Sequence, residues 1–189
     1  MRDKKRTLIL ASSSPRRKEL IRKITENFTV TEPVCEEISD GEPHFIAEMN
    51  ATRKGRAADG DFVVACDTVV ACDGIIYGKP MDEIRAVGML KALNGRTHTV
   101  ISGVYVRSEK KETVFCDESF VTFRTLTEEE IVAYVKKYRP LDKAGAYGLQ
   151  DGVVVAEFSG SYDNIVGLPT EKLREVLRKY IYVKEESDN

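Results

Sequence analysis

The segment that most limits how this chain can fold is residues 62–71, an almost unbroken apolar run that is typical of a buried strand. An Asp-Gly pair at 73–74 follows and predicts a tight hairpin turn into a short strand over Ile75–Tyr77. Two longer strands, expected over residues 97–106 and 113–123, alternate like an antiparallel pair with one face in water. Since helical patterns separate these hairpins, the sequence predicts an α/β fold with a mixed β-sheet, not a purely parallel doubly wound one.

Helix signals stand at the ends of several other segments. Ser14 and Pro15 are typical of a helix cap and first helical residue, and Thr127 with Glu130 forms a capping-box pattern. We expect helices over residues 15–24, 43–58, 82–93, 128–137 and 169–180, and short strands over 8–11, 28–30 and 153–158. The 189 residues show no internal repeat or low-complexity linker, so we expect one domain over 1–189 that ends in a polar tail at about 184–189.

Charge and hydropathy argue against several classes of protein. Lysine and arginine number 29 against 31 acidic residues, a net charge of −2, so no global positive field favours a stable nucleic-acid complex. No apolar run is long enough to cross a membrane, and the apolar part after the basic start MRDKKR is too short for a signal peptide. Four scattered cysteines without metal-ligand spacing indicate reduced thiols, so we expect a cytoplasmic protein.

The segment SSSPRRK, residues 12–18, places three cations at the start of an expected helix. A helix N-terminus already carries partial positive charge, so cations there are repelled unless an anion is bound. Backbone N–H groups, serine hydroxyls and a bidentate arginine together suit a phosphate group. The alternative is that the arginines turn outward into solvent or pair with acidic residues elsewhere in the chain.

Asp67 interrupts the apolar run at 62–71, and an ionised carboxylate there is costly unless it is paired, binds a metal or faces a cleft. Thr68 places a hydroxyl on the opposite face of the same strand. Lys79, held in the turn GKP at 78–80, follows one short hairpin later. A carboxylate and an ammonium at one cleft edge suit a metal-bound phosphate. A structural aspartate at a strand end and an ordinary surface turn are the alternatives.

The segment PLDKAGAYGLQDG, residues 140–152, combines glycines with polar groups. Gly145 and Gly148 would let the backbone wrap a ligand. Tyr147 would pack on a ring of that ligand, and the amide of Gln150 offers both a donor and an acceptor to a base edge. A helix-to-strand connector with turn glycines is the alternative, and Lys143 is either a phosphate ligand or a surface charge.

An acidic loop at residues 32–42 supplies a further candidate. Glu37 suits a Mg²⁺ site, which needs one or two carboxylates plus substrate oxygens, although acidic loops are commonly just solvated. His44 and His98, the only histidines, stand in no triad pattern with a serine or cysteine nucleophile, and no P-loop motif occurs. Phosphate chemistry by positioning, a metal and a base is therefore the best fit.

Six segments resemble the Maf family of nucleoside triphosphate pyrophosphatases. They are LASSSPRR at 10–17, CDTVV at 66–70, GKP at 78–80, LNGRTHTVISGV at 93–104, DKAGAYGLQ at 142–150 and SYDNIVGLP at 161–169. Any one segment is modest support, whereas the ordered set covers nearly the whole chain and is highly specific. The chain departs from the family pattern at Cys66 and at Asn50, where a small residue and an apolar residue, respectively, are usual.

The resemblance implies an extended, twisted mixed sheet flanked by helices, with two lobes around a cleft, similar to the inosine triphosphate pyrophosphatase fold. It implies hydrolysis of nucleoside triphosphates to the monophosphate and pyrophosphate with a divalent metal, Mg²⁺ or Mn²⁺. The residues implied are the general base Asp67, the metal and phosphate residues Glu37, Lys54 and Lys79, and the substrate-binding residues Arg16, Thr68 and Gln150. We further expect Glu37 and Asp67 to hold the metal, and Ser12 of the serine turn to help bind the phosphates. Among these, Arg16, Thr68 and Gln150 match positions associated with substrate choice, in the combination of the dTTP/UTP-preferring branch rather than the 7-methyl-GTP branch.

Family analogy also suggests a homodimer and a link to inhibition of septum formation. Two rival functions stay open. One is a non-catalytic nucleotide-binding regulator of septum formation, which would bind dTTP without releasing pyrophosphate; the strand carboxylate Asp67 with cations nearby argues against it, because binding alone does not need that carboxylate. The other is a nucleic-acid-binding protein that uses residues 16–18, against which the net charge of −2 argues.

Overall fold

The computed structural model of this chain describes residues 7–109 and 111–182. Its elements in chain order are β1 (Leu8–Ala11), α1 (Pro15–Arg22), β2 (Phe28–Thr31), α2 (Pro43–Ala57), β3 (Phe62–Cys72), β4 (Ile75–Tyr77), α3 (Glu83–Leu93), β5 (Thr97–Ser108), β6 (Lys111–Phe123), α4 (Glu128–Tyr138), the short 3₁₀ turns η1 (Ala144–Ala146) and η2 (Leu149–Asp151), β7 (Val155–Ser159), α5 (Tyr162–Val166) and α6 (Thr170–Tyr182). The polar tail expected at 184–189 lies outside the described residues.

The described strands form one mixed sheet of seven, in the order β2-β1-β3-β5-β6-β7 with β4 paired to β3 beside this path. β1 is parallel to both β2 and β3, and all other pairs are antiparallel. The longest strands are β3, β5 and β6, with 11, 12 and 13 residues. The expected α/β fold with an extended mixed sheet is confirmed.

One edge of β3 changes partner partway along the strand. β1 pairs with β3 only as far as Ala65, and β4 pairs with it only from Val70. Between these points, at residues 66–69, the described strands pair with β3 only on the β5 side. This opening in the sheet edge, called the β3 gap below, puts Asp67 and Thr68 beside the connections that follow β1 and β4.

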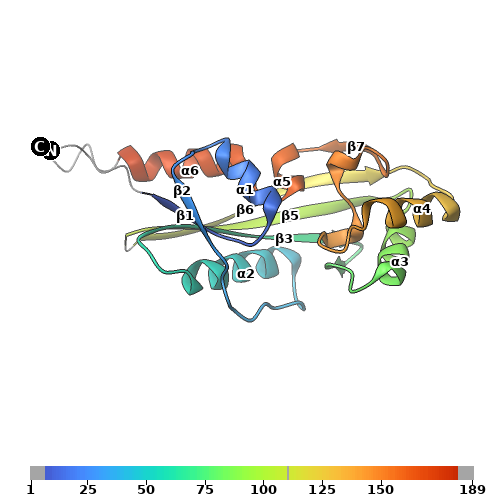
Figure 1. The fold of residues 1–189 in the computed structure, drawn as a ribbon, viewed down its shortest axis with the longest axis horizontal. Coiled ribbons are helices and arrows are strands. Elements are labelled where there is room, and N and C mark those ends of the chain that lie inside the picture. Colours follow the sequence, from blue (N-terminus) through green and yellow to red (C-terminus); the bar gives the residue numbers. More distant parts are fainter. Residues whose placement is uncertain (1–6, 110, 183–189) are drawn as a thin grey trace, which may run out of the picture.

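Helices cover both faces of the sheet (Figure 1). On one face α2 packs against the strands, and its Ala51 lies in a cluster with Ala65 of β3. On the other face α1 and α6 contribute Leu20 and Leu173 to a cluster that contains Cys66. Because Ala65 and Cys66 are neighbours on β3, alternate side chains of one strand build the two cores.

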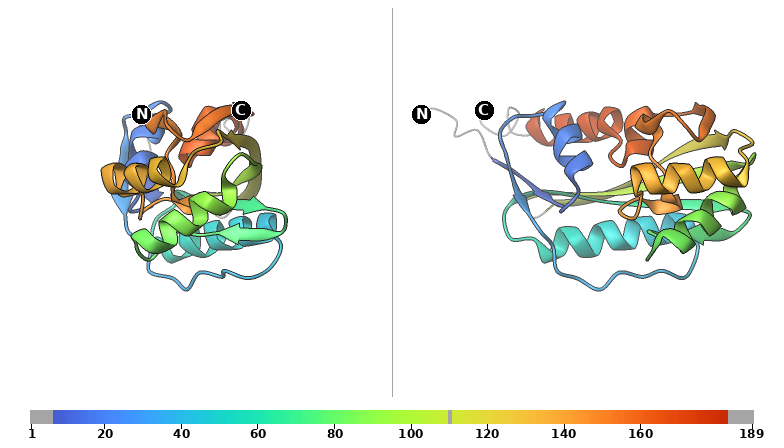
Figure 2. Two further views of the ribbon diagram at one scale, coloured as in Figure 1. Left: turned by 90° about the vertical axis from the view of Figure 1, so that its right-hand side faces the viewer. Right: turned by 45° about the vertical axis from the view of Figure 1, so that its right-hand side comes forward.

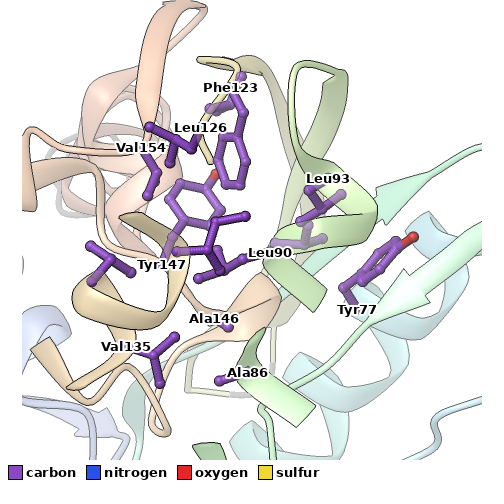
Figure 3. Close-up of a cluster of buried hydrophobic side chains, with 14 of the residues drawn as sticks. Tyr77, Ala86, Leu90, Leu93, Phe123, Leu126, Val135, Ala146, Tyr147 and Val154 are labelled. Carbon is purple, nitrogen blue, oxygen red and sulfur yellow. The ribbon is translucent and has the colours of Figure 1, made fainter. Parts of the chain in front are cut away.

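A third core lies at the end of the sheet where α3 and α4 pack (Figure 2). Its side chains include Leu90 and Leu93 of α3, Val135 of α4, and Phe123 and Tyr147 (Figure 3). This core contains Ala146 and Tyr147 from the middle of the glycine-rich segment, residues 140–152, so it fixes that segment against the sheet.

The antiparallel pairing of β5 with β6 is confirmed, but the expected wet face is wrong for β5. Residues 100–106 of β5 are buried without interruption. The reason is that α2 packs on one face of the strand while α5 and the α1–α6 layer pack on the other. β6 is partly exposed along most of its length.

All four cysteines are free thiols, as expected. In the part of the chain that the structure describes, no helix is both long and apolar enough to span a membrane.

Candidate active site

A cleft of about 800 Å³ opens at the β3 gap. Its walls come from the turn after β1, the loop before α2, the middle of β3, the turn after β4, and the segment 142–150. Every residue proposed from the sequence as a site residue lines this cleft: Ser12, Arg16, Glu37, Lys54, Asp67, Thr68, Lys79 and Gln150. The fold thus brings together side chains that are up to 138 positions apart in sequence (150 − 12).

Asp67 lies at the floor of the cleft and is buried, with 8% of its surface exposed. Its Oδ1 accepts a hydrogen bond from Lys54 Nζ at 2.6 Å, and its Oδ2 accepts one from Asn50 Nδ2 at 3.2 Å. Lys54 and Asn50 are four residues apart on α2, so both reach the sheet from the same face of that helix. The cost of burying the Asp67 carboxylate is offset by one ion pair and one amide donor.

Glu37 belongs to the loop before α2 and is half exposed. Its Oε2 lies 3.0 Å from Lys54 Nζ, so Lys54 bridges the Glu37 and Asp67 carboxylates. No group of three or more His, Cys, Asp or Glu side chains among the described residues is arranged to hold a metal ion. The protein therefore offers two carboxylates at one point of the cleft, with an ammonium group between them.

Asn50 explains how the Glu37 loop is held. Its Oδ1 accepts from the backbone N–H of Ile38 at 2.8 Å, and its Nδ2 donates to the Ile38 carbonyl at 3.0 Å. The same amide contacts Asp67, so one buried side chain ties the loop to the floor of the cleft. From the sequence, Asn50 is only a polar residue in an apolar position; the structure shows that it positions the loop, and its spacing of four residues from Lys54 is the signal that could have indicated this role.

The start of α1 forms one wall of the cleft. Ser14 is the helix cap and Pro15 the first helical residue, as expected, and no acidic residue lies in the first turn. Arg16 Nη1 donates to Asp142 Oδ2 at 2.5 Å and its Nη2 to the Asp142 carbonyl at 3.1 Å. Lys143 Nζ lies 2.8 Å from Asp142 Oδ1. An acidic side chain from elsewhere in the chain thus balances charge at this helix start, which was one of the two alternatives left open.

Arg17 differs from Arg16 in its role. Its Nε donates to the Gly167 carbonyl at 2.8 Å, and its Nη2 donates to Thr68 Oγ1 at 3.0 Å. Thr68 Oγ1 also lies 2.9 Å from Ser102 Oγ on β5. These bonds fix the Thr68 hydroxyl on the face of β3 opposite to Asp67, and they join α1 to the segment before α6.

Lys79 and Gln150 are exposed polar side chains on the opposite wall. Gly145 N donates to the Gly78 carbonyl at 3.2 Å, so the turn that carries Lys79 is bonded to the glycine-rich segment. Beside Gln150, the Tyr134 hydroxyl donates to Asp151 Oδ2 at 2.6 Å and accepts from Gly148 N at 3.1 Å. Both side chains are therefore presented from anchored backbone.

Tyr147 is among the residues that line the cleft, but its side chain is buried, with 6% of its surface exposed, so its stacking on a ligand stays a prediction. Its hydroxyl bonds His98 Nε2 at 2.9 Å, and its ring packs edge-on against His98 and Phe123. Burial raises the pKa of Tyr147 and lowers the pKa of His98 to about 4, so both are neutral core groups. The buried aromatic ring thus stabilises the segment at the edge of the cleft.

Comparison with known proteins matches this chain to the family described as Maf-like protein over residues 7–180. A dTTP/UTP pyrophosphatase of Symbiobacterium thermophilum is 41% identical over 183 residues, which cover 93% of this chain and 94% of that protein. A dTTP/UTP pyrophosphatase of Bacillus pumilus is 40% identical over 92% of this chain and 96% of that protein. One from Thermococcus gammatolerans is 42% identical, with 89% and 96% covered. The chain belongs to the Maf-like protein family.

Proposed function

We propose that this protein is a nucleoside triphosphate pyrophosphatase that hydrolyses dTTP and UTP to the monophosphate and pyrophosphate. The observation that carries the proposal is the buried carboxylate of Asp67, which faces a cleft lined by Arg16, Lys54, Lys79 and Lys143. A base beside several cations suits the attack of water on a polyanion. The printed names of the relatives above supply the substrate class.

A divalent cation, Mg²⁺ or Mn²⁺, fits the donors at the floor of the cleft. Such ions are usually held by one or two carboxylates together with substrate phosphate oxygens, and Glu37 and Asp67 meet at one ammonium group. Glu37 and Asp67 would hold the metal. When bound, it would supply positive charge that stabilises the phosphate oxygens and the leaving pyrophosphate.

Each side chain of the cleft has a separate role in the proposed reaction. Asp67 accepts a proton from the water that attacks the α-phosphorus, the bond between the α-phosphorus and the bridging oxygen breaks, and pyrophosphate leaves with the electron pair of that bond. Arg16, Lys54 and Lys79 hold the negative charge of the phosphates as it shifts toward the leaving group. Ser12 shapes the turn before α1, where its Oγ accepts from Ser14 N at 3.2 Å.

Selection of the base is assigned to Gln150, with Thr68 and Arg16 shaping its surroundings. Gln150 presents an exposed amide that can donate and accept at once, which matches the adjacent donor and acceptor on the edge of thymine or uracil. Thr68 is held by Arg17 and Ser102, so it limits the space available on its side of β3.

Further properties are part of the same proposal. The α1–α6 core and the α3–α4 core would be two lobes of one domain around the cleft, because β3 and β5 contribute residues to both. We expect action in the cytoplasm, where nucleotide pools are found, a homodimer by family analogy, and no stable complex with nucleic acid. A link to septum formation stays an expectation from the family.

The decisive experiment compares Asp67→Asn with Asp61→Asn, in which an exposed carboxylate outside the cleft lining is lost just before β3. Pyrophosphate release from dTTP and UTP with Mg²⁺ should fall by about 10²- to 10⁴-fold in Asp67→Asn, because the amide cannot accept the proton. The Asp61→Asn protein should match the unaltered one. Thermal melting checks that both variants fold.

Activity that survives Asp67→Asn would remove Asp67 from the reaction. Binding of dTTP by the unaltered protein without any pyrophosphate release would favour the non-catalytic regulator of septum formation instead.

A further inference from the structure

Asp142 holds two cations of the cleft through separate oxygen atoms. Its Oδ2 accepts from Arg16 Nη1 at 2.5 Å, and its Oδ1 lies 2.8 Å from Lys143 Nζ. Arg16 belongs to α1, while Lys143 belongs to the segment after α4, so the carboxylate joins opposite walls of the cleft. A phosphate group offers the same arrangement, with separate anionic oxygens for two cations.

The exposed fractions of Arg16, Lys143 and Asp142 indicate which of the three side chains can move out of the ion-pair cluster. Arg16 and Lys143 keep only 22% and 16% of their side-chain surface exposed, whereas Asp142 keeps 55%. The cations are therefore set into the cleft and the carboxylate covers them from the solvent side. Ion pairs with a partner this exposed are weak, so a multiply charged anion can replace the carboxylate.

The backbone around Asp142 is fixed independently of its side chain. Leu141 N donates to the Arg139 carbonyl at 2.8 Å, and Lys143 N donates to the Pro140 carbonyl at 3.3 Å. Arg16 Nη2 also bonds the backbone carbonyl of Asp142, a contact that does not need the carboxylate. Rotation of the Asp142 side chain is thus enough to free Lys143 Nζ and Arg16 Nη1, while Arg16 Nη2 keeps its bond to the backbone carbonyl.

We propose that Arg16 and Lys143 form an anion subsite, that the Asp142 carboxylate fills it in the free protein, and that a phosphate group of the nucleotide or of pyrophosphate replaces the carboxylate there. For the nucleotide, this rests on the proposed function. It gives Lys143 a phosphate-binding role and makes Asp142 an internal competitor of the substrate.

Protonation does not open the subsite near neutral pH. Partial burial alone would raise the pKa of Asp142, but hydrogen bonds from Lys143 and Arg16 lower it to about 2. The carboxylate is ionised under all ordinary assay conditions, so only a competing anion displaces it.

The test measures binding of inorganic pyrophosphate by calorimetry at neutral pH to the unaltered protein, Asp142→Asn, Lys143→Met and the double variant. Asp142→Asn removes the competitor and should tighten binding several-fold, up to about tenfold, because two weak ion pairs no longer have to break. Lys143→Met should weaken binding and also shrink the gain from Asp142→Asn. Glu32→Gln removes a carboxylate that lines the same cleft, whereas the described ion pairs of both cations are with Asp142, so this change should alter affinity much less.

Three results would overturn the subsite. If Asp142→Asn weakens pyrophosphate binding, Asp142 orients the cations and does not compete with the anion. An equal gain from Glu32→Gln would show a general effect of charge. Absence of pyrophosphate binding in both the unaltered protein and Asp142→Asn would show that the subsite does not bind this anion. dTTP turnover, measured separately, decides the proposed function on its own, since the expected binding pattern can hold in a protein without turnover and can fail in one with it.

Discussion

At the scale of single residues, three cations of the cleft are paired with carboxylates of the protein itself in the free state. Lys54 lies between Glu37 and Asp67, and Asp142 lies between Arg16 and Lys143. Each ion pair keeps a long side chain in one place before the substrate arrives. Because these side chains are already ordered in the free protein, binding costs less side-chain conformational entropy.

Substitution of Asn50 tests whether the cleft is ordered before the substrate binds. Asn50→Ala removes the amide that holds both backbone groups of Ile38 and contacts Asp67. We expect the free energy of unfolding to fall by about 2 kcal/mol, because buried polar groups lose their partners. Since Ile38 follows Glu37, the Mg²⁺ concentration needed for half-maximal activity should rise. Urea unfolding and a metal titration of dTTP hydrolysis measure the two effects.

Thr52→Val is the matched control for Asn50→Ala. Thr52 lies on the same helix, and within the described residues its hydroxyl bonds only the Glu48 carbonyl, at 2.7 Å. This variant should leave the metal dependence unchanged. A metal dependence that is also unchanged in Asn50→Ala would contradict the positioning role of Asn50.

Some site residues are visible in the sequence because they break a local rule. Asp67 is a charge within an apolar strand, and Arg16 is a cation at a helix start, so each points to a partner outside its own segment. Asp142 and Asn50 do not break a local rule strongly enough to be recognised as site residues from the sequence. The contact of Asp142 with Arg16 spans 126 positions, and no local pattern encodes a pairing at that distance.

At the scale of elements, the position of α2 depends on one glycine of β5. A Cβ added at Gly103 would lie 2.3 Å from the carbonyl carbon and oxygen of Ala47. The backbone of α2 cannot move aside as a flexible side chain would. This close approach sets how far Asn50 and Lys54 reach across to β3.

Gly103→Ala should therefore destabilise the protein by about 3 kcal/mol and lower activity, because α2 must shift away from the sheet. Gly88→Ala on α3 is the matched control, since a Cβ there meets nothing within 4 Å. That change should stabilise the protein by about 0.5–1 kcal/mol, as alanine favours the helix over glycine. Chemical unfolding of the two variants gives both signs, and a Gly103→Ala protein as stable as the unaltered one would contradict the close packing.

Most elements were predictable because capping residues, hairpin turns and periodicity are local signals. The caps Ser14 and Thr127 and the Asp-Gly hairpin turn occur as expected. α5 was missed, because its five residues are too few to show a helical period. Burial on both faces of β5 was missed too, since it depends on helices that come before and after it in the chain.

At the scale of the whole molecule, stability depends on pH through His98. Burial lowers the pKa of His98 to about 4, below the value of about 6.5 expected in the unfolded chain. Between these values the unfolded chain binds a proton that the folded protein does not. The free energy of unfolding should then fall as pH drops from about 6.5 to 4, by up to about 3 kcal/mol.

His98→Gln should flatten this part of the pH profile of stability, measured by urea unfolding at several pH values. His44→Gln serves as a control, because the contribution of His44 to the pH dependence of stability has the opposite sign. Burial alone would lower the pKa of His44, but hydrogen bonds to Glu42 and Glu118 raise it, so His44 adds stability at low pH that is lost as pH rises. An unchanged slope in His98→Gln would show that other groups cause the acid sensitivity.

The β3 gap has a consequence for how the protein is made. The walls around it come from residues that lie far apart in the sequence, namely those that follow β1 and Gly167. During synthesis the first 140 or so residues can emerge from the ribosome with the floor of the site present but one wall missing. The cleft is therefore closed only after Gly167 has been synthesised, so a chain that ends before the segment 142–150 would lack one wall of the site.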